Sequence, residues 1–579
     1  MGGACSRKRD QVHQEDTLQR AISKRVSKNA SSKWLATSLY RSSTFSERRD
    51  KKCPTLMGLC IKTVCDNITK HPTFFMLPRD ISQQIFDALV KSQRLSDVSF
   101  KAFQDCALQD IHFGECAGVN DSWMDVIASQ GPSLLSVDLS GSTITDCGLI
   151  QLEHCENLQA LNLNYCDCIT DAGLHHLSGL TNISSLSFKR NNSITAQGMT
   201  GLSSLVNLVK LDLERCLGIS GGLANLQGLI KLEFLNINWC NCINDNDMKQ
   251  LSALINLKGL EMSCCKVTDI GISYLIGLHK LNLLNLEGCP VTASCLDSLS
   301  ALSALRYLNL GHCHLSDEGC EKFADFERLK VLNLGFNQIT DACLVHLKGL
   351  ASLESLNLDS CRIGDDGLGN LAGLRLLKSL VLSDTDVGNA GLDHLSGLTK
   401  LENINLSFTL ITDSGMKNLA GLSSLKSLNL DVRQITDSGI ADLTCLTGLT
   451  HLDLFGARIT DTGTNYLRSF KNLKSLELCG GGLTDAGMKN IKELISLSLL
   501  NLSQNCNLSD KSLELISGLT GLVSLNMSNS RVTGAGLRHL KALKNLKSLT
   551  LESCKVTASD IKRLQSTDLP NLVSFRPEQ

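Results

Sequence analysis

Cysteine is the reactive residue type that the sequence offers most often. The 579-residue chain contains 25 cysteines, and some form close pairs such as Cys166/Cys168 and Cys240/Cys242. Thiols at short spacings can bind metal ions or form disulfides. Here, however, the cysteines recur at the period of a repeat and not at a ligand spacing such as CxxC. We therefore predict reduced, buried thiols that pack a core, with no metal ion and no cofactor.

Glycine and histidine, which often belong to catalytic motifs, are also placed by the repeat. The sequence contains no nucleophile elbow, phosphate-binding glycine loop, zinc-protease helix or paired-carboxylate pattern. Its glycines recur with the repeat period, and His175, His346 and His539 lie on segments expected to be helical. We therefore predict a protein that is not an enzyme.

The elements that position the cysteines are about nineteen copies of one repeat. Segments such as ALNLNYCDCITDAGLHHL and YLNLGHCHLSDEGCEKF share the pattern LxxLxLxxCxxITDxGLxxL, with a period of 24 or 25 residues. The first leucine of the LxL step recurs from Leu161 to Leu549. Val137 occupies this position in an earlier copy, and a degenerate copy at Ile111 is expected to be the N-terminal unit. Such periodicity predicts a solenoid.

Each part of the repeat has a physical task. The LxL alternation predicts a short strand with one buried face, and stacked strands form a parallel sheet on the concave side. The small residue five positions later, Cys166 or Asn191 for example, must fit where the chain bends inward. Thr-Asp pairs such as Thr170-Asp171 predict the start of a short convex helix. The Asn inside many LxL steps, as at Asn162, is expected to hydrogen-bond along its own column.

This pattern resembles the cysteine-containing subclass of leucine-rich repeats over about four fifths of the chain. The resemblance implies an α/β horseshoe over residues 108–579, with about 18 to 19 repeats, a parallel concave sheet and convex helices. Repeats of this subclass are common in the substrate receptors of cullin-based ubiquitin ligases. The fold itself serves many functions, so the site must carry the functional argument.

Large side chains at the two positions after LxL are the candidate partner-binding residues. They would lie in columns on the concave face, where exposed aromatic groups and arginines are typical interface anchors. Trp239 is the strongest single candidate. The set consists of Tyr165, Arg190, Arg215, Trp239, His312, Phe336, Phe408 and Phe455.

Residues 53–107 have helical apolar spacing and carry two competing resemblances. One is to the F-box, which docks on a Skp adaptor, although the later Val-Cys and Trp of that family are missing. The other is to the (Ser/Thr)-Leu-xxx-Cys-xxx-aliphatic box that inserts into elongin C, at Thr55-Leu56, Cys60 and Val64. Leu77-Pro78-xx-Ile81-xxx-Ile85 also fits the cullin-selecting box that accompanies it. A helical cap that shields the first repeat would explain the same apolar residues. The adaptor-binding candidates are Leu56, Cys60, Leu77, Pro78, Ile81, Ile85, Phe86 and Leu89.

The first 52 residues form a basic tether. Residues 1–72 hold 15 Lys and Arg against 6 Asp and Glu, whereas the whole chain has a net charge of −2. Met1-Gly-Gly-Ala-Cys-Ser matches the myristoylation pattern at Gly2, and Cys5 with Arg7-Lys8-Arg9 would supply the second membrane signal. The alternative is an unmodified polar tail. We expect this segment to be disordered.

Two function classes remain open. The first is the substrate-recognition subunit of a Skp- or elongin-linked cullin ligase that feeds proteasomal degradation. The second is a membrane-tethered interaction scaffold without ubiquitin transfer. The sequence lacks an apolar run long enough to span a bilayer and a secretory leader, so a cytoplasmic, peripherally attached protein is expected. The acidic body argues against nucleic acid as a partner.

Overall fold

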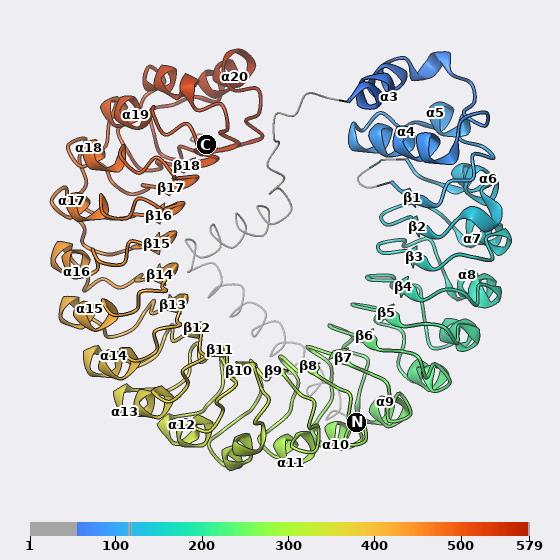
Figure 1. The fold of residues 1–579 in the computed structure, drawn as a ribbon, viewed down its shortest axis with the longest axis horizontal. Coiled ribbons are helices and arrows are strands. Elements are labelled where there is room, and N and C mark those ends of the chain that lie inside the picture. The colour runs from blue at the N-terminus through green and yellow to red at the C-terminus, as the bar shows by residue number, and fades with distance from the viewer. Residues whose placement is uncertain (1–54, 114–115, 117, 577–579) are drawn as a thin grey trace, which may run out of the picture.

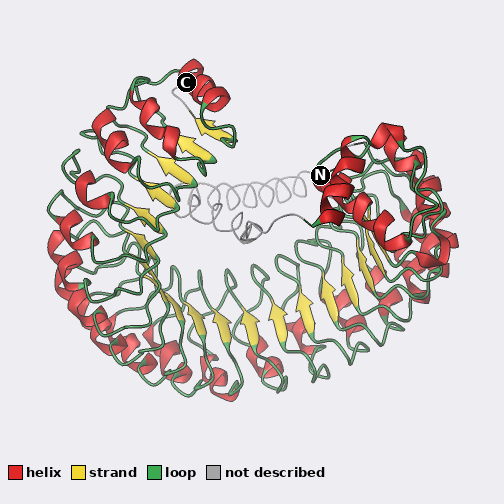
Figure 2. Ribbon diagram, turned by 45° about the horizontal axis from the view of Figure 1, so that its top comes forward, coloured by secondary structure: helices red, strands yellow, loops and turns green. Residues whose placement is uncertain are grey.

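The computed structural model describes residues 55–113, 116 and 118–576, which form an open ring (Figure 1). Short strands line its inner side and helices cover its outer side (Figure 2). Helices α3 (Leu56–Asp66) and α20 (Ala558–Thr567) lie at the two ends, on opposite sides of the opening (Figure 1). The predicted horseshoe is therefore confirmed.

One parallel sheet of 20 strands runs through the described residues. Each strand pairs with the next along the chain, and central residues face each other, as in Leu161↔Leu186. The strands are β1 (Asp110–His112), β2 (Ser136–Asp138), β3 (Ala160–Asn162), β4 (Ser185–Ser187), β5 (Lys210–Asp212), β6 (Phe234–Asn236), β7 (Gly259–Glu261), β8 (Leu283–Asn285), β9 (Tyr307–Asn309), β10 (Val331–Asn333), β11 (Ser355–Asn357), β12 (Ser379–Val381), β13 (Asn403–Asn405), β14 (Ser427–Asn429), β15 (His451–Asp453), β16 (Ser475–Glu477), β17 (Leu499–Asn501), β18 (Ser524–Asn526), β19 (Ser548–Thr550) and β20 (Ser574–Arg576).

The sheet has one strand more than the repeat pattern predicted. The degenerate copy around Ile111 does form β1, and β20 adds a further unit at the other end. Phe575 occupies the position of the central leucine in β20, opposite Leu549. This unit departs from the repeat pattern because phenylalanine replaces the central leucine of its strand.

Short helices return the chain along the convex side. Besides α3 and α20, the α-helices are α4 (Arg79–Lys91), α5 (Asp97–Lys101), α6 (Met124–Ala128), α7 (Asp146–Ile150), α8 (Asp171–His176), α9 (Asp245–Leu251), α10 (Asp269–Ser273), α11 (Cys295–Leu299), α12 (Asp341–Leu347), α13 (Asp365–Leu368), α14 (Asn389–Leu395), α15 (Asp413–Leu419), α16 (Asp437–Asp442), α17 (Gly463–Leu467), α18 (Met488–Ile491) and α19 (Asp510–Ile516). The 3-10 helices are η1 (Ile68–Lys70), η2 (Asp121–Trp123), η3 (Gly131–Ser133), η4 (Gln151–His154), η5 (Leu177–Gly179), η6 (Gly198–Ser204), η7 (Gly222–Leu226), η8 (Cys320–Asp325), η9 (Gly369–Leu371) and η10 (Gly536–Ala542).

The Thr-Asp pairs do more than start these helices. Thr170 caps α8, since its hydroxyl accepts the N–H of Ala172. Its own N–H and hydroxyl donate to the two carboxylate oxygens of Asp146 in the preceding repeat, at 2.8 and 2.6 Å. Asp413 receives the same two hydrogen bonds from Thr436. This Thr–Asp ladder therefore joins neighbouring repeats along the convex side.

The buried cysteines join neighbouring repeats on the inner side. The Cys166 thiol donates to the carbonyl oxygen of Leu139 in the preceding repeat at 3.2 Å, and Cys361 donates to Leu334 in the same way. Where Asn191 replaces the cysteine, its amide donates to the equivalent carbonyl of Leu163 at 2.8 Å. Cysteine and asparagine are interchangeable here because both are small donors that satisfy an otherwise orphaned carbonyl.

A helical cap closes the N-terminal end of the solenoid. Phe86 of α4 packs edge-on against Phe103 and Phe113, with ring centroids 5.6 and 6.1 Å apart. Phe100 of α5 stacks on Trp123 in the first repeat at 4.8 Å. The cap and the repeats therefore share one continuous apolar core.

Candidate protein-binding surface

The residue four positions after each central strand leucine lies in an unusual backbone conformation. Its φ angle is near +60° in most repeats, a left-handed region that favours glycine and asparagine. Gly288 and Gly456 do occupy this position, but so do Tyr165 (φ 60°) and Trp239 (φ 62°). We call this series, which runs from Gly141 to Ser553 along the loops after the strands, the left-handed column.

Hydrogen bonds between repeats hold the left-handed column in place. The backbone N–H of Tyr165 donates to the carbonyl of Lys189 in the next repeat at 2.8 Å, and that of Trp239 donates to Ser263 at 2.7 Å. These bonds fix the backbone without using the side chain. A bulky group at such a position is strained and has no packing role that requires it, which is typical of functional sites.

Two cation–π pairs form at the N-terminal end of the column. The Arg190 guanidinium lies 5.5 Å from the ring centroid of Tyr165, and that of Arg215 lies 5.1 Å from the ring of Trp239. Tyr165 is 46% exposed and Trp239 is 47% exposed. These four residues come from four consecutive repeats, and we call them the aromatic–arginine ladder. Such pairs present rigid, half-desolvated groups to a partner.

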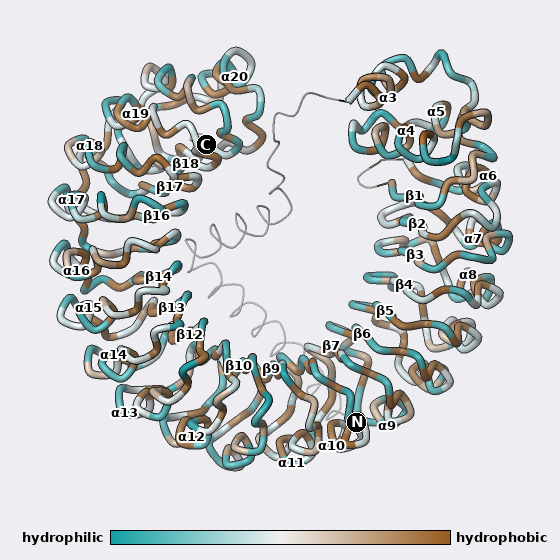
Figure 3. Tube along the Cα trace, viewed as in Figure 1, coloured by the Kyte–Doolittle hydropathy of each residue, from teal (hydrophilic) through white to brown (hydrophobic). Residues whose placement is uncertain are grey.

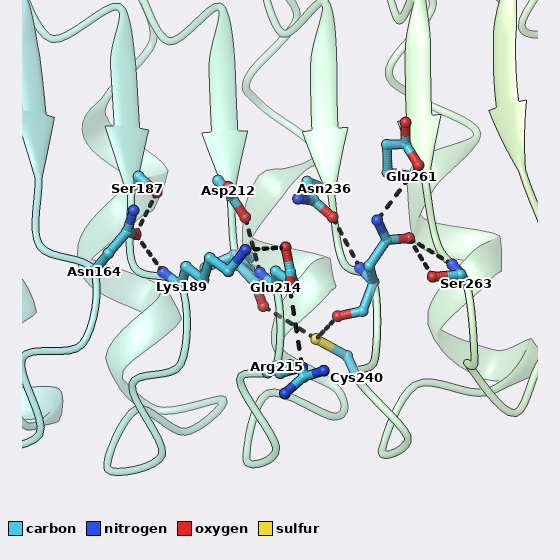
Figure 4. Close-up of polar contacts among 12 residues, drawn as sticks. Asn164, Ser187, Lys189, Asp212, Glu214, Arg215, Asn236, Cys240, Glu261 and Ser263 are labelled. Atoms are coloured by element: carbon cyan, nitrogen blue, oxygen red, sulfur yellow. Dashed lines mark hydrogen bonds and ion pairs between the residues drawn. The ribbon is translucent and has the colours of Figure 1, made fainter. Parts of the chain in front are cut away.

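Charged and polar side chains on the adjacent strand ends support the ladder (Figure 4). Glu214 accepts an ion pair from Lys189 at 2.7 Å and lies 3.9 Å from Arg215. Asn164 accepts hydrogen bonds from the Ser187 hydroxyl and the Lys189 N–H at 2.5 and 2.7 Å. The Nε atom of Arg215 is buried and lacks a hydrogen-bond acceptor among the described residues. The site therefore retains an unused donor beside an exposed tryptophan.

The polar column inside LxL does not bond mainly to itself, which corrects our expectation. The side-chain oxygen of Asn236 accepts the N–H of Asn238 in its own repeat, and Asn333 accepts that of Gly335. Asn285 additionally donates to Glu261 in the neighbouring repeat at 2.7 Å. The asparagines thus fix the turn that leads into the left-handed column, because an Asx turn needs a side-chain acceptor two residues earlier.

Of the other four predicted concave residues, two stack on each other and two do not. His312 and Phe336 stack in parallel at 4.0 Å. Burial lowers the pKa of His312, so this imidazole is neutral at pH 7. Phe408 also belongs to the left-handed column and is exposed. Phe455 precedes the column position, is half-buried, and donates its backbone N–H to Asp453.

The two sets of adaptor candidates differ in exposure. Thr55 caps α3, and Leu56 is 78% exposed. Cys60, one helical turn later, is exposed as well. Of the F-box-like residues, Leu77 and Pro78 lie on the surface and Ile81 is half-buried. The remaining three, Ile85, Phe86 and Leu89, are buried in the cap and face no solvent.

The described residues include no helix that is both long enough and apolar enough to cross a bilayer. Within the same ranges, no three His, Cys, Asp or Glu side chains come close enough together to hold one metal ion. The lipidation candidates Gly2 and Cys5 lie outside the described residues.

Comparisons with known proteins agree with this architecture. A family described as leucine-rich repeat region matches residues 266–507, and a second leucine-rich repeat family matches residues 154–177. No curated protein sequence matches the chain. The mouse RP105/MD-1 complex is 19% identical over 82% of this chain and 84% of that chain, with a TM-score of 0.51.

Two other solved structures are more distant in shape. The TLR13–ssRNA13 complex is 19% identical, covers 82% of this chain and 86% of its own, and has a TM-score of 0.45. A leucine-rich-repeat protein of Leptospira interrogans is 20% identical over 76% of this chain and 94% of its own, with a TM-score of 0.39. The repeat geometry and the family matches together identify the chain as a leucine-rich-repeat protein.

Proposed function

We propose that this leucine-rich-repeat protein is the substrate-recognition subunit of a cullin-based ubiquitin ligase. In this proposal α3 docks an adaptor, and the aromatic–arginine ladder captures the protein to be ubiquitinated. Other subunits carry out the covalent chemistry and commit the captured protein to the proteasome. The observation that carries the proposal is the outward apolar face of α3.

Helix α3 divides into an inner and an outer face. Cys65 is buried and Ile61 and Val64 pack on the cap core, which anchors one side of the helix. Leu56 and Cys60 lie on the exposed side, one turn apart, at the spacing at which helical side chains form one contact surface. Figure 3 shows α3 as a mainly hydrophobic helix at the very end of the ring.

This distribution favours the elongin-type resemblance over the F-box resemblance. In the elongin-type pattern, the leucine and the cysteine contact the adaptor, and here both are exposed. In the F-box-like segment, Ile85, Phe86 and Leu89 are already used to pack the cap. Contact between these three residues and an adaptor would require the cap core to open, which would cost several kcal/mol.

The concave side supports protein capture. Leucine-rich-repeat solenoids act as extended binding surfaces, and the RP105 structure was solved with its partner MD-1. In this chain, the ladder offers two aromatic rings and two guanidinium groups in consecutive repeats. Tryptophan, tyrosine and arginine are the residue types that contribute most to binding free energy in protein interfaces.

Affinity purification with mass spectrometry tests the adaptor. The intact chain is compared with Leu56→Asp/Cys60→Asp and with Lys62→Asp, a matched change at an exposed position of the same helix. We expect an elongin-type adaptor and a cullin with the intact chain and with Lys62→Asp, and neither with the double variant. Recovery of a Skp adaptor with the intact chain, and its loss with Leu77→Asp/Pro78→Ala, would support the F-box resemblance instead.

Retention of no adaptor by any bait would favour the membrane-tethered scaffold. That alternative is also tested directly, by labelling cells with an alkyne analogue of myristate. We expect the label on the intact chain and its loss on Gly2→Ala, with Gly3→Ala as the control for a neighbouring change. Palmitate labelling that depends on Cys5 would show the second of the two signals that stable attachment to a membrane needs.

A further inference from the structure

The lysines and arginines of the concave side lie in two consecutive repeats. Four positions of each repeat carry the concave side chains: the first and third residues of the strand, and the two residues that follow LxL. From β2 to β19, the lysines and arginines at these positions all belong to the repeats of β4 and β5. We call these four residues the basic patch: Lys189, Arg190, Lys210 and Arg215.

The rest of the concave side has the opposite charge. At the same four positions, the repeats of β4 and β5 hold two acids, Asp212 and Glu214. The other repeats from β2 to β19 hold nine Asp and Glu, six of which are not buried, and no Lys or Arg. An anionic segment is therefore attracted at one place on this side and repelled along the remainder.

Three of the four cations in the basic patch lie over exposed aromatic rings. Besides the two pairs of the aromatic–arginine ladder, the Lys210 ammonium lies 5.7 Å from the ring centroid of Phe234. Gly259 in the next repeat makes room for this ring, because a Cβ there would lie 2.6 Å from its Cδ1 atom. The rings hold the cations in place and leave their hydrogen-bond donors to a partner.

The basic patch is only partly neutralised within the chain. Glu214 pairs with Lys189 at 2.7 Å and lies 3.9 Å from Arg215, and this carboxylate is the less exposed member of both pairs (Figure 4). Arg190 and Lys210 are exposed and form no ion pair with a carboxylate among the described residues. Two fixed cations with free donors therefore face the inside of the ring.

The distribution of charge decides which kind of partner fits. Carboxylates of Asp and Glu match the planar donors of a guanidinium group and also pair with an ammonium group. Adjacent strands lie about 4.8 Å apart, so one short peptide segment can contact the repeats of β4 and β5 together. A nucleic acid carries charge along its whole length and would meet the acids of the neighbouring repeats.

We infer that the basic patch binds a short segment rich in Asp and Glu on the partner protein. Carboxylates of this segment accept hydrogen bonds from Arg190 and Lys210, while its neighbouring side chains pack against Tyr165 and Trp239. The inference rests on the proposed function in one respect, since it takes the acidic segment to belong to the protein that is captured for ubiquitination.

Fluorescence anisotropy with the purified full-length chain tests this inference. The probe is a fluorescein-labelled peptide of alternating glutamate and serine, and its control has glutamine in place of glutamate. We expect the glutamine peptide to bind about tenfold more weakly or worse, and Arg190→Gln/Lys210→Gln to weaken the glutamate peptide by a similar factor. The matched variant Arg362→Gln/Arg458→Gln removes two exposed arginines outside the four concave positions and should leave the affinity unchanged.

Equal affinities of the intact chain and Arg190→Gln/Lys210→Gln would overturn the inference, and so would equal weakening in the matched variant. A labelled oligothymidylate that binds more tightly than the glutamate peptide, and is weakened by the same double change, would overturn it in favour of nucleic acid. Far-UV circular dichroism confirms that each variant is folded.

Carbodiimide cross-linking locates the bound probe, because it joins a lysine ammonium to a glutamate carboxylate in direct contact with it. Mass spectrometry should identify Lys210 or Lys189 as the main cross-linked residue. A main product at any other lysine would overturn the inference. The purified chain contains no adaptor, so failure of the peptide to bind leaves the adaptor test unaffected. Conversely, absence of an adaptor in cells leaves the peptide affinity as a separate result.

Discussion

The Thr–Asp ladder is incomplete at Gly364, and replacement of this glycine by threonine should stabilise the solenoid. Asp341 accepts the N–H of Gly364 at 2.8 Å through Oδ1, but its Oδ2 receives no hydroxyl there. A Cβ built on Gly364 would lie 3.4 Å from this Oδ2 atom. The backbone of Gly364 (φ −112°, ψ −168°) is extended like that of Thr436 (φ −125°, ψ −174°). Threonine can therefore adopt it without strain.

The expected gain follows from three contributions. A hydrogen bond to a charged acceptor contributes about 1.5–3 kcal/mol, less where solvent reaches it. Threonine exceeds glycine as an N-cap by a few tenths of a kcal/mol, and loss of a glycine lowers the entropy of the unfolded chain by about 0.5 kcal/mol. We therefore expect Gly364→Thr to raise the free energy of local opening by about 1–3 kcal/mol.

Hydrogen exchange is the appropriate assay, because a solenoid of this size opens locally and its thermal midpoint responds weakly. Amide protection in β10 to β12 is measured for Gly364→Thr and for Gly364→Val, which has the same shape without the hydroxyl. Most of the gain should be absent in the valine variant and in Gly364→Thr combined with Asp341→Ala. If Gly364→Val protected the amides as well as Gly364→Thr does, the hydrogen bond between the hydroxyl and the carboxylate would be refuted. A gain in protection that persists without Asp341 would refute it too.

Three further predictions concern the repeat motif and the candidate binding surface. Gly439→Ala should lower the free energy of local opening by about 1–3 kcal/mol, as measured by hydrogen exchange, since a Cβ there would lie 2.5 Å from Oδ1 of Asp413. Burial raises the pKa of the Cys216 thiol to about 12, so at pH 8 only about one molecule in ten thousand carries the reactive thiolate. Native Cys216 should therefore resist iodoacetamide, as measured by mass spectrometry. Trp239→Ala should weaken partner capture about thirtyfold in quantitative pull-downs, with stability little changed.

Each of these three predictions has a matched control elsewhere in the chain. Gly397→Ala should be neutral, because a Cβ there meets nothing within 4 Å. The exposed Cys445 should be alkylated within minutes under the same conditions. Phe408→Ala, which removes an equally exposed ring without a cation–π partner, should weaken capture less than Trp239→Ala. Equal effects in any of these pairs would contradict the corresponding structural argument.

The repeat pattern was enough to predict the fold because most positions of the motif have a physical role within their own repeat. Alternation around Leu161 predicts the strand, and Thr170 predicts the start of a helix. The reason for the glycine in the same motif was not visible in the sequence. In the structure, the space beside Gly173 holds the carboxylate of Asp146 from the preceding repeat. A contact across 24 residues of sequence becomes apparent only once the repeats are stacked.

The positions of the candidate binding residues could be predicted from the sequence, but their geometry could not. Side chains after LxL were expected on the concave face, and Tyr165, Arg190, Arg215 and Trp239 do form a ladder. The sequence carried no sign that they occupy a left-handed backbone, because this conformation depends on hydrogen bonds from one repeat to the next. The burial of Asp453 and Glu477 was not visible either, because they replace asparagines of the LxL motif and become buried only when the strands stack.

The left-handed column consists of two parts whose side chains differ chemically. Between them lies Val432, which does not adopt a positive φ, because a β-branched residue is disfavoured in that conformation. Aromatic groups and arginines occupy the left-handed column only before this break, up to Phe408, and the positions after it hold Gly456, Gly480, Gln504, Asn529 and Ser553. A partner must therefore place aromatic-compatible or acidic groups near β3 to β6, whereas the column after Val432 offers it only uncharged side chains.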